Sequence, residues 1–292
     1  MDLKELLSSF AQITLFAVML SMGMVLGFRG IVRLWRRPSL LLRCVVAAFV
    51  AVPLAAMVVT KVLPLPFEVR AGIAAMAVIP GAPVIYRKMI KGPGDAELAG
   101  SFQATMALLS IALVPLWFGI ITAIYPTGAS APLAVVFKQI MLVQGIPLLV
   151  GAAIAHWLPD LADDFNEPLN RISSAMLVGV VLLVVVMGLS LVLKAGPLPI
   201  FAVVLMAAAG LVAGHYLGGS DPTTRQTIAL ANGSRNAGLA LALITLNFPA
   251  VAQEVLVTIA SYAVMSGIAG KIYTHLYQKQ LARRAHPQDA PV

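Results

Sequence analysis

A polar, glycine-broken stretch lies inside an apolar segment that is long enough to cross a membrane. It reads Ala231-Asn-Gly-Ser-Arg-Asn-Ala-Gly238, and Arg235 stands roughly ten residues from either polar boundary of the segment 223–248. A charge at that depth costs on the order of 3 kcal/mol to insert, and it persists where it faces a cavity, a partner or a substrate. A second break, Ile79-Pro-Gly-Ala-Pro83, interrupts an apolar segment in the other half of the chain. Two interrupted segments in matching halves are typical of the binding site of a secondary transporter.

The composition is that of an integral membrane protein. Of the 292 residues, 60% are hydrophobic and 11% are charged, whereas a soluble domain has about 25% charged residues. Apolar runs of about 20 residues favour spanning helices over the shorter alternating strands of a barrel. The net charge of +8 comes from basic residues beside the apolar runs, which indicates membrane orientation and not nucleic-acid binding. The single Cys44 excludes an intramolecular disulfide and a cysteine-rich metal site, and we expect no metal and no cofactor.

Nine membrane-spanning helices can be drawn along the chain. Their ranges are 8–28, 39–61, 67–90, 97–124, 132–157, 172–194, 197–218, 223–248 and 250–276. The third is broken at 80–83 and the eighth at 232–238. Connections are short, so residues 1–292 are predicted to form one transmembrane domain with a polar tail at 279–292. The start of the chain lacks a basic stretch, so we expect no cleavable signal peptide.

Basic residues predict the orientation in a cell membrane. With nine spans, the basic clusters at 29–37, 87–91 and 279–284 all fall on one face, and Lys271 stands near the same end of the last span. The positive-inside rule then places the C-terminus in the cytoplasm and the N-terminus outside. The two breaks lie five helices apart, so their spans cross the membrane in opposite directions. Residues 8–124 and 172–276 can therefore form inverted repeats, with the helix at 132–157 linking them.

The two breaks supply most of the candidate site residues. At the first, Pro80 removes a backbone donor and Gly81 permits an unwound path. The candidates at the second break are Asn232, Gly233, Ser234, Arg235 and Asn236. Unwound backbone is tolerated inside a bilayer only where protein or a water-filled cavity satisfies it. The alternative is a pair of packed kinks whose small residues serve helix contact.

Arg235 has no acidic partner at its own depth, because all 12 acidic residues fall in connections or at span ends. Its counter-charge can be a bound anion, backbone carbonyls or an acid reached through a re-entrant path. The planar guanidinium is suited to bidentate recognition of carboxylate, sulfate or phosphate. A half-helix N-terminus at either break would add positive potential. The predicted substrate is an organic anion.

Several motifs along the chain resemble one known family. They are Met22-Gly-Met-Val-Leu-Gly-Phe28, Val32-Arg-Leu-Trp-Arg-Arg-Pro38, Pro53-Leu, Ile79-Pro-Gly81 and Asn236-Ala-Gly-Leu-Ala-Leu-Ala242. In this order and spacing they resemble the bile acid:sodium symporter family, which includes bacterial sodium-dependent organic-anion transporters. The resemblance implies an all-α fold of nine or ten helices, divided into a panel and a core domain. It also implies two broken helices that cross in the core, and transport by alternating access.

The chain departs from the family where the family binds sodium. A Ser and an Asn that help to bind sodium on the first crossing helix correspond to Ile85 and Tyr86 here. A Glu and a Gln on the second crossing helix correspond to Ala231 and Arg235. The comparison with the family pattern implies that both usual sodium sites are lost and that Arg235 can replace one sodium as a tethered cation. Sodium is therefore doubtful as the coupling ion, and proton coupling stays open.

Other polar residues within the spans are weaker candidates. They are Ser101, Gln103 and Thr105 in the fourth span, Gln144 in the fifth, and Tyr262 and Ser266 in the ninth. The resemblance places further ligands in the fourth span, whereas helix packing or interhelical hydrogen bonding is the alternative for each residue.

The favoured function is a secondary transporter of a small or amphipathic organic anion, with membrane lipid as its surroundings and no enzymatic activity. One alternative is a conventional sodium:organic-acid symporter with a rebuilt sodium site. Another is a membrane enzyme on lipid diphosphates, in which Asp160-Leu-Ala-Asp163-Asp164 holds magnesium. Such an enzyme usually needs a second metal-binding motif, and a solvated connection is the simpler interpretation of this stretch. A third alternative is a related metalloid permease. In the wider group that the chain resembles, this activity relies on a thiol at the first break, where Ile79 stands here.

Overall fold

A computed structural model describes residues 3–124, 132–249 and 252–285, and within these ranges the chain is built from helices. The elements are α1 Leu3–Ile31, η1 Leu34–Arg36, α2 Pro38–Val46, η2 Ala47–Ala51, α3 Val52–Val62, α4 Phe67–Val78, α5 Val84–Ile90, α6 Ala96–Ile124, α7 Leu133–Ile140, η3 Met141–Gly145, α8 Ile146–Trp157, α9 Pro159–Ala195, α10 Pro197–Leu217, α11 Pro222–Gly233, α12 Ala237–Asn247 and α13 Ala252–Ala285. The η1 segment is a 3₁₀ turn, and η2 and η3 are π-helical turns. The predicted all-α fold is confirmed.

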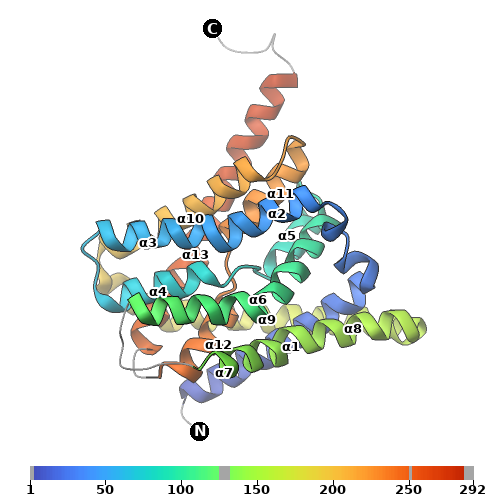
Figure 1. The fold of residues 1–292 in the computed structure, drawn as a ribbon, viewed down its shortest axis with the longest axis horizontal. Coiled ribbons are helices and arrows are strands. Elements are labelled where there is room, and N and C mark those ends of the chain that lie inside the picture. The colour runs from blue at the N-terminus through green and yellow to red at the C-terminus, as the bar shows by residue number, and fades with distance from the viewer. Residues whose placement is uncertain (1–2, 125–131, 250–251, 286–292) are drawn as a thin grey trace.

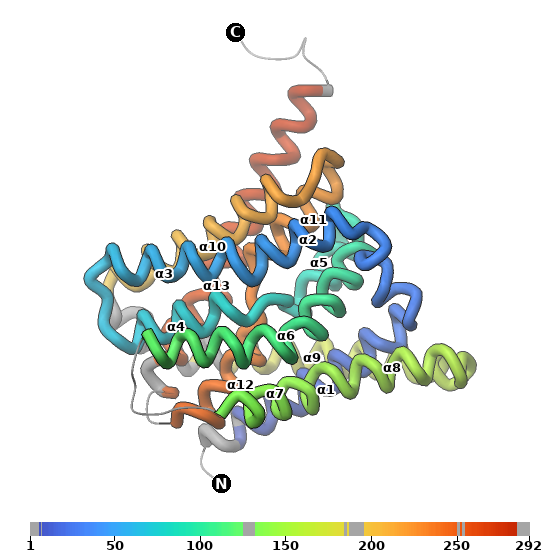
Figure 2. Tube along the Cα trace, in the orientation of Figure 1, coloured from blue at the N-terminus to red at the C-terminus, as the bar shows by residue number. Residues whose placement is uncertain are grey.

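The long helices pack side by side in two groups that can be followed in Figure 1. Helix α1 packs against α8 and α9, and these helices lie along one side of the molecule in Figures 1 and 2. Helix α10 packs against α11 and α3 on the other side, while α13 contacts α4, α9 and α10. Helices α1 and α8 touch backbone to backbone, since a Cβ at Gly23 would stand 2.9 Å from Ala152 N. Small residues thus allow the close crossing that is common between helices in a membrane.

Six helical stretches of the described chain are long and apolar enough to cross a membrane. They are Ser8–Arg36, Pro38–Val62, Ala96–Ile124, Leu133–Trp157, Pro197–Leu217 and Val255–Arg284. The chain is thus a multi-pass membrane protein. The two broken segments are absent from this set because their halves have 12, 7, 12 and 11 residues, each too short to cross alone. The nine-span topology and the inverted repeats stay predictions.

Both predicted breaks are present, with shifted boundaries. The first separates α4 from α5 at 79–83, and the second separates α11 from α12 at 234–236. The second break is shorter than the predicted 232–238, because Asn232 and Gly233 still belong to α11. The expectation of a solvated connection at 160–164 is wrong. These residues form the first turns of α9, which Pro159 opens at a position where its missing N–H costs nothing.

Candidate functional site

The two helix breaks meet in the interior of the fold. Pro80 and Arg235 form an isolated antiparallel bridge, and the Asn236 N–H donates to the Ile79 carbonyl at 3.2 Å. Gly81 has a φ of +83°, a conformation that a residue with a side chain rarely adopts. Its carbonyl accepts a 2.6 Å hydrogen bond from Gln103 Nε2. The unwound backbone of each break is therefore partly satisfied by the other break and by α6, as burial in a membrane requires.

Polar side chains of the second break stabilise the ends of its two helices. The Asn236 side-chain Oδ1 accepts from the Leu239 N–H at 3.0 Å and so caps the N-terminus of α12. Asn232 donates its Nδ2 to the Ile228 carbonyl at 3.0 Å, while its buried Oδ1 has no partner among the described residues. The Tyr262 hydroxyl donates to the Gly233 carbonyl at 2.8 Å, which ties α13 to the end of α11.

Arg235 is buried, with only 4% of its surface exposed. Its Nη1 donates to the backbone carbonyl of Ala48 at 3.1 Å. Nε and Nη2 have no hydrogen-bond partner among the residues that the structure describes. The ion pairs found in that part of the chain, Arg33–Glu97 and Arg171–Glu167, are exposed. Among the residues that the structure describes, the hydrogen-bond partner of Arg235 is thus a backbone carbonyl.

The Ala48 carbonyl is free to accept because of a π-helical turn followed by a proline. The Val52 N–H donates to Ala47 in the wider π register, and Pro53 has no N–H to offer. The next carbonyl, that of Phe49, is similarly released and accepts from Trp117 Nε1 at 3.0 Å. Pro53 thus exposes two backbone acceptors within an apolar span, and an arginine and a tryptophan use them.

A cavity of about 420 Å³ lies beside the breaks. Its walls come from the end of the first break and α5, from α9, from the second break and the start of α12, and from α13. The lining residues are Ala82, Pro83, Val84, Ile85, Lys88, Leu177, Val181, Ser234, Arg235, Asn236, Ala237, Gly238, Ala263, Val264, Ser266, Gly267, Ile268 and Lys271. They include three basic residues and no acidic one, and most are apolar. The volume is in the range of small-molecule sites.

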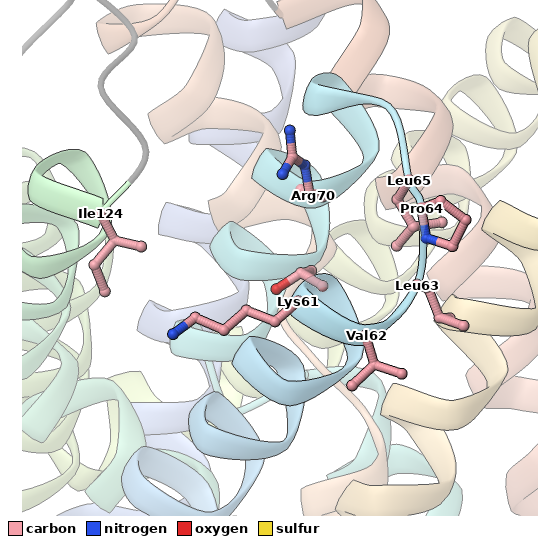
Figure 3. A pocket seen from close by; sticks show the side chains of 8 residues that line it. Lys61, Val62, Leu63, Pro64, Leu65, Arg70 and Ile124 are labelled. Carbon is pink, nitrogen blue, oxygen red and sulfur yellow. The ribbon is translucent and has the colours of Figure 1, made fainter.

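A second cavity, of about 530 Å³, lies where α3 connects to α4 (Figure 3). Lys61 and Arg70 are the basic residues that line it, and Ile124 at the end of α6 borders it. It contains no residue of either break, and the chain that follows Ile124 lies outside the described residues.

Three of the remaining sequence candidates do not line the cavity beside the breaks. Ser101 accepts from the Leu34 N–H at 2.8 Å, and Thr105 accepts from Trp35 Nε1 at 3.1 Å, so both residues hold the η1 turn against α6. Gln144 lies in η3, is 1% exposed, and its Nε2 has no partner among the described residues.

Of three further candidates, one lines the cavity, one contacts the first break and one lies against α6. Tyr86 is half-buried against Gly100 and does not line the cavity. Ser266 lines it. Gln103 contacts the first break directly.

The sequence analysis missed three groups. Lys88 and Lys271 entered it only as indicators of orientation, and the Ala48 carbonyl did not enter it at all. A proline inside an apolar span, such as Pro53, is a usable signal for released carbonyls. The position of Lys271 within the span 250–276 is a signal as well, because an ionisable residue inside a span usually has a function.

Comparison with known proteins agrees with the resemblance found in the motifs. Residues 12–195, more than half of the chain, match the model of the sodium bile acid symporter family. The chain is 23% identical over 281 residues to the uncharacterized sodium-dependent transporter YocS of Bacillus subtilis (strain 168), covering 95% of this chain and 86% of that protein. It is 22% identical over 268 residues to the probable chloroplastic sodium/metabolite cotransporter BASS1 of Arabidopsis thaliana, covering 90% of this chain and 66% of that protein. The chain therefore belongs to the sodium bile acid symporter family.

Proposed function

We propose that this protein is a secondary transporter that moves a small or amphipathic organic anion across the cell membrane by alternating access. The observation that carries the proposal is the pair of touching helix breaks beside a cavity whose charged lining residues are all basic. Broken helices that meet at a cavity are typical of transporter binding sites. The family and both relatives are named as transporters, which argues against an enzyme.

The proposed topology has nine spans, with α4–α5 and α11–α12 each crossing as a broken pair. Helices α1 and α7–α9 would form the panel, and the remaining helices the core. This division is supported by the packing of α1 on α8 and α9, and the cavity lies where α9 faces the breaks. The positive-inside rule would place the Lys88 and Lys271 side of the cavity toward the cytoplasm.

We further propose that sodium does not drive this transport. Ile85 and Ala231, at positions where the family has sodium ligands, offer no side-chain oxygen, and both are buried. The buried guanidinium of Arg235 would also repel a nearby cation. The opposite outcome, a rebuilt sodium site, is supported by the relatives, which are named as sodium-dependent. It is also supported by the unpartnered Oδ1 of Asn232, an oxygen of the type that sodium takes as a ligand.

In this proposal Arg235 acts as a tethered cation and does not contact the substrate. Its Nη1 reaches Ala48 of η2, an element that contributes no residue to the cavity lining. Arg235→Lys should then leave transport nearly unchanged, because the positive charge is kept. Arg235→Gln combined with Ala231→Glu should create sodium dependence. If the arginine instead binds the substrate, Arg235→Lys loses bidentate geometry and weakens apparent affinity by about 1–3 kcal/mol.

The test is uptake of labelled organic acids into sealed proteoliposomes, with the sodium and proton gradients varied independently. We expect uptake that continues when choline replaces sodium at constant pH and membrane potential. Uptake that stops under this exchange would overturn the sodium proposal and establish a rebuilt site. Absence of uptake for every organic acid, from protein that is folded and correctly inserted, would overturn the transport proposal itself.

A further inference from the structure

Two lysines of the cavity beside the breaks approach each other from different helices. Lys88 belongs to the last turn of α5, and Lys271 belongs to α13. A Cβ at Gly270 would stand 3.4 Å from Lys88 Nζ, so this ammonium lies against α13, one residue before Lys271. Both lysines line the cavity. The fold thus brings together two cations that are far apart in the sequence.

No described residue neutralises these two charges. Neither lysine takes part in an ion pair or a side-chain hydrogen bond among the described residues, and no acidic residue lines the cavity. The preceding residue, Arg87, differs in this respect, because its Nη2 is bonded to Asn170 and Ser173. Lys88 is half-buried and Lys271 is exposed. Their like charges repel each other, so an anion between them would be favoured.

The remainder of the cavity wall is apolar. The side chains of Val84, Ile85, Leu177, Val181, Val264 and Ile268 face the same space. An apolar body placed against them would be removed from water, and this burial favours binding by a free energy of about 25 cal/mol for each Å² of apolar surface. A ligand that satisfies both parts of the cavity has a compact anionic group at one end and an apolar body at the other.

We propose that Lys88 and Lys271 form the anion-recognition pair of the cavity and select an amphipathic small molecule by its charged end. The assignment rests on the proposed transport of an organic anion and adds the residues that recognise it. The electrostatic binding free energy between two ammonium ions is more favourable for a group of higher charge density. A phosphonate should therefore bind more tightly than a carboxylate. Arg235 also lines the cavity, but its Nη1 is bonded to Ala48, and the proposal gives it no part in this recognition.

Three probes with the same aromatic body test the pair. Near neutral pH, benzylphosphonate carries between one and two negative charges, phenylacetate one and phenylacetamide none. Calorimetric titration measures their binding to the protein in phosphatidylcholine nanodiscs. We expect benzylphosphonate to bind most tightly and phenylacetamide not to bind. Lys88→Gln and Lys271→Gln should each weaken anion binding about tenfold or more, since each removes a charge-assisted hydrogen bond. Lys88→Arg and Lys271→Arg keep the charge and should bind benzylphosphonate within about threefold of wild type.

Lys91→Gln is the matched control, because Lys91 is an exposed lysine on the same side that does not line the cavity. Equal weakening by Lys91→Gln, or binding of the neutral amide as tight as that of the anions, would overturn the proposal. An anionic lipid headgroup offers similar chemistry, so the titrations are repeated in nanodiscs with phosphatidylglycerol. Lysine-dependent binding of phosphatidylglycerol by mass spectrometry, with no binding of the probes in phosphatidylcholine, would show a lipid site and overturn the substrate assignment.

Binding and uptake are measured separately, which separates the two proposals. Lysine-dependent probe binding without any uptake would refute transport and retain the recognition pair. Organic-acid uptake that is unchanged in Lys88→Gln and Lys271→Gln would refute the recognition pair and retain transport.

Discussion

Replacement of Arg235 by methionine should stabilise the protein and abolish its transport. Methionine has a similar length and no charge. The replacement leaves the Ala48 carbonyl without its donor, which costs about 1–3 kcal/mol. It also removes two buried, unpartnered N–H groups, Nε and Nη2, whose burial costs about 1–3 kcal/mol each. The net change is a stabilisation of about 1–3 kcal/mol, in line with the finding that apolar replacement of a buried charge is often stabilising.

Thermal unfolding of purified protein in detergent measures this change. Domains of about 150–250 residues gain about 2–4 °C in melting temperature for each kcal/mol, so we expect a rise of at least 2 °C. Arg171→Met is the control, because Arg171 is exposed and its ion-pair partner within the described part of the chain is Glu167 on its own helix. Its stability should change by less than about 0.5 kcal/mol, and its uptake should stay at the wild-type level. A loss of more than about 2 kcal/mol in Arg235→Met would show that the arginine is structural. Normal uptake by Arg235→Met would refute its function as a tethered cation.

Three further changes test the packing around the site. Gly151→Ala would push a Cβ into the Leu20 carbonyl and to within 2.9 Å of another backbone atom of α1, so the unfolding free energy should fall by about 1–3 kcal/mol or more in thermal unfolding. Gln103→Leu removes the donor to the Gly81 carbonyl and should slow uptake about tenfold, with hydrogen exchange at 79–83 increased, whereas unchanged exchange would contradict the contact. Asp221→Ala removes the N-terminal cap of α11 and should cost about 1 kcal/mol at neutral pH. The hydrogen bond from the Thr224 N–H holds the pKa of Asp221 below its ordinary value, so this cap is present above about pH 4 and is lost as the pH falls through the folded-state pKa. The difference between wild type and variant should therefore vanish in acid.

The two breaks could be predicted from the sequence because proline and glycine act locally. Pro80, Gly81 and Pro83 cannot continue a helix, and the structure unwinds there. The second break was predicted four residues too long. Asn236 is a strong N-cap residue and starts α12 immediately, which limits the unwound stretch to 234–236. The start of α9 at Pro159 was missed because an acidic stretch beside prolines was interpreted as a connection. Proline in the first turn is also a signal for a helix start.

The electrostatic partners could not be predicted, because they are determined by tertiary contacts. Arg235 and Ala48 are 187 positions apart, and the acceptor is a backbone carbonyl that the residue type does not reveal. Lys88 and Lys271 meet only because α5 ends beside α13. Sequence reasoning identified Arg235 as a buried cation in need of a partner. It left open which of three partners it would find, and the structure supplies one that required a π-helical turn.

Pro53→Ala tests whether the released carbonyl is what holds Arg235 in place. The new N–H at position 53 could donate to Ala48 in the π register or to Phe49 in the α register, and either bond competes with the present donors. Stability should therefore be retained or raised, while uptake falls about tenfold because Arg235 loses an acceptor worth at least about 1.4 kcal/mol. Pro147→Ala is the matched control, since Pro147 also follows a π-helical turn, with the Ile146 N–H bonded to Met141, but no arginine uses that turn among the described contacts. Equal uptake by the two proline variants would show that the position of the guanidinium does not depend on the proline, and the tethered cation would then need another anchor.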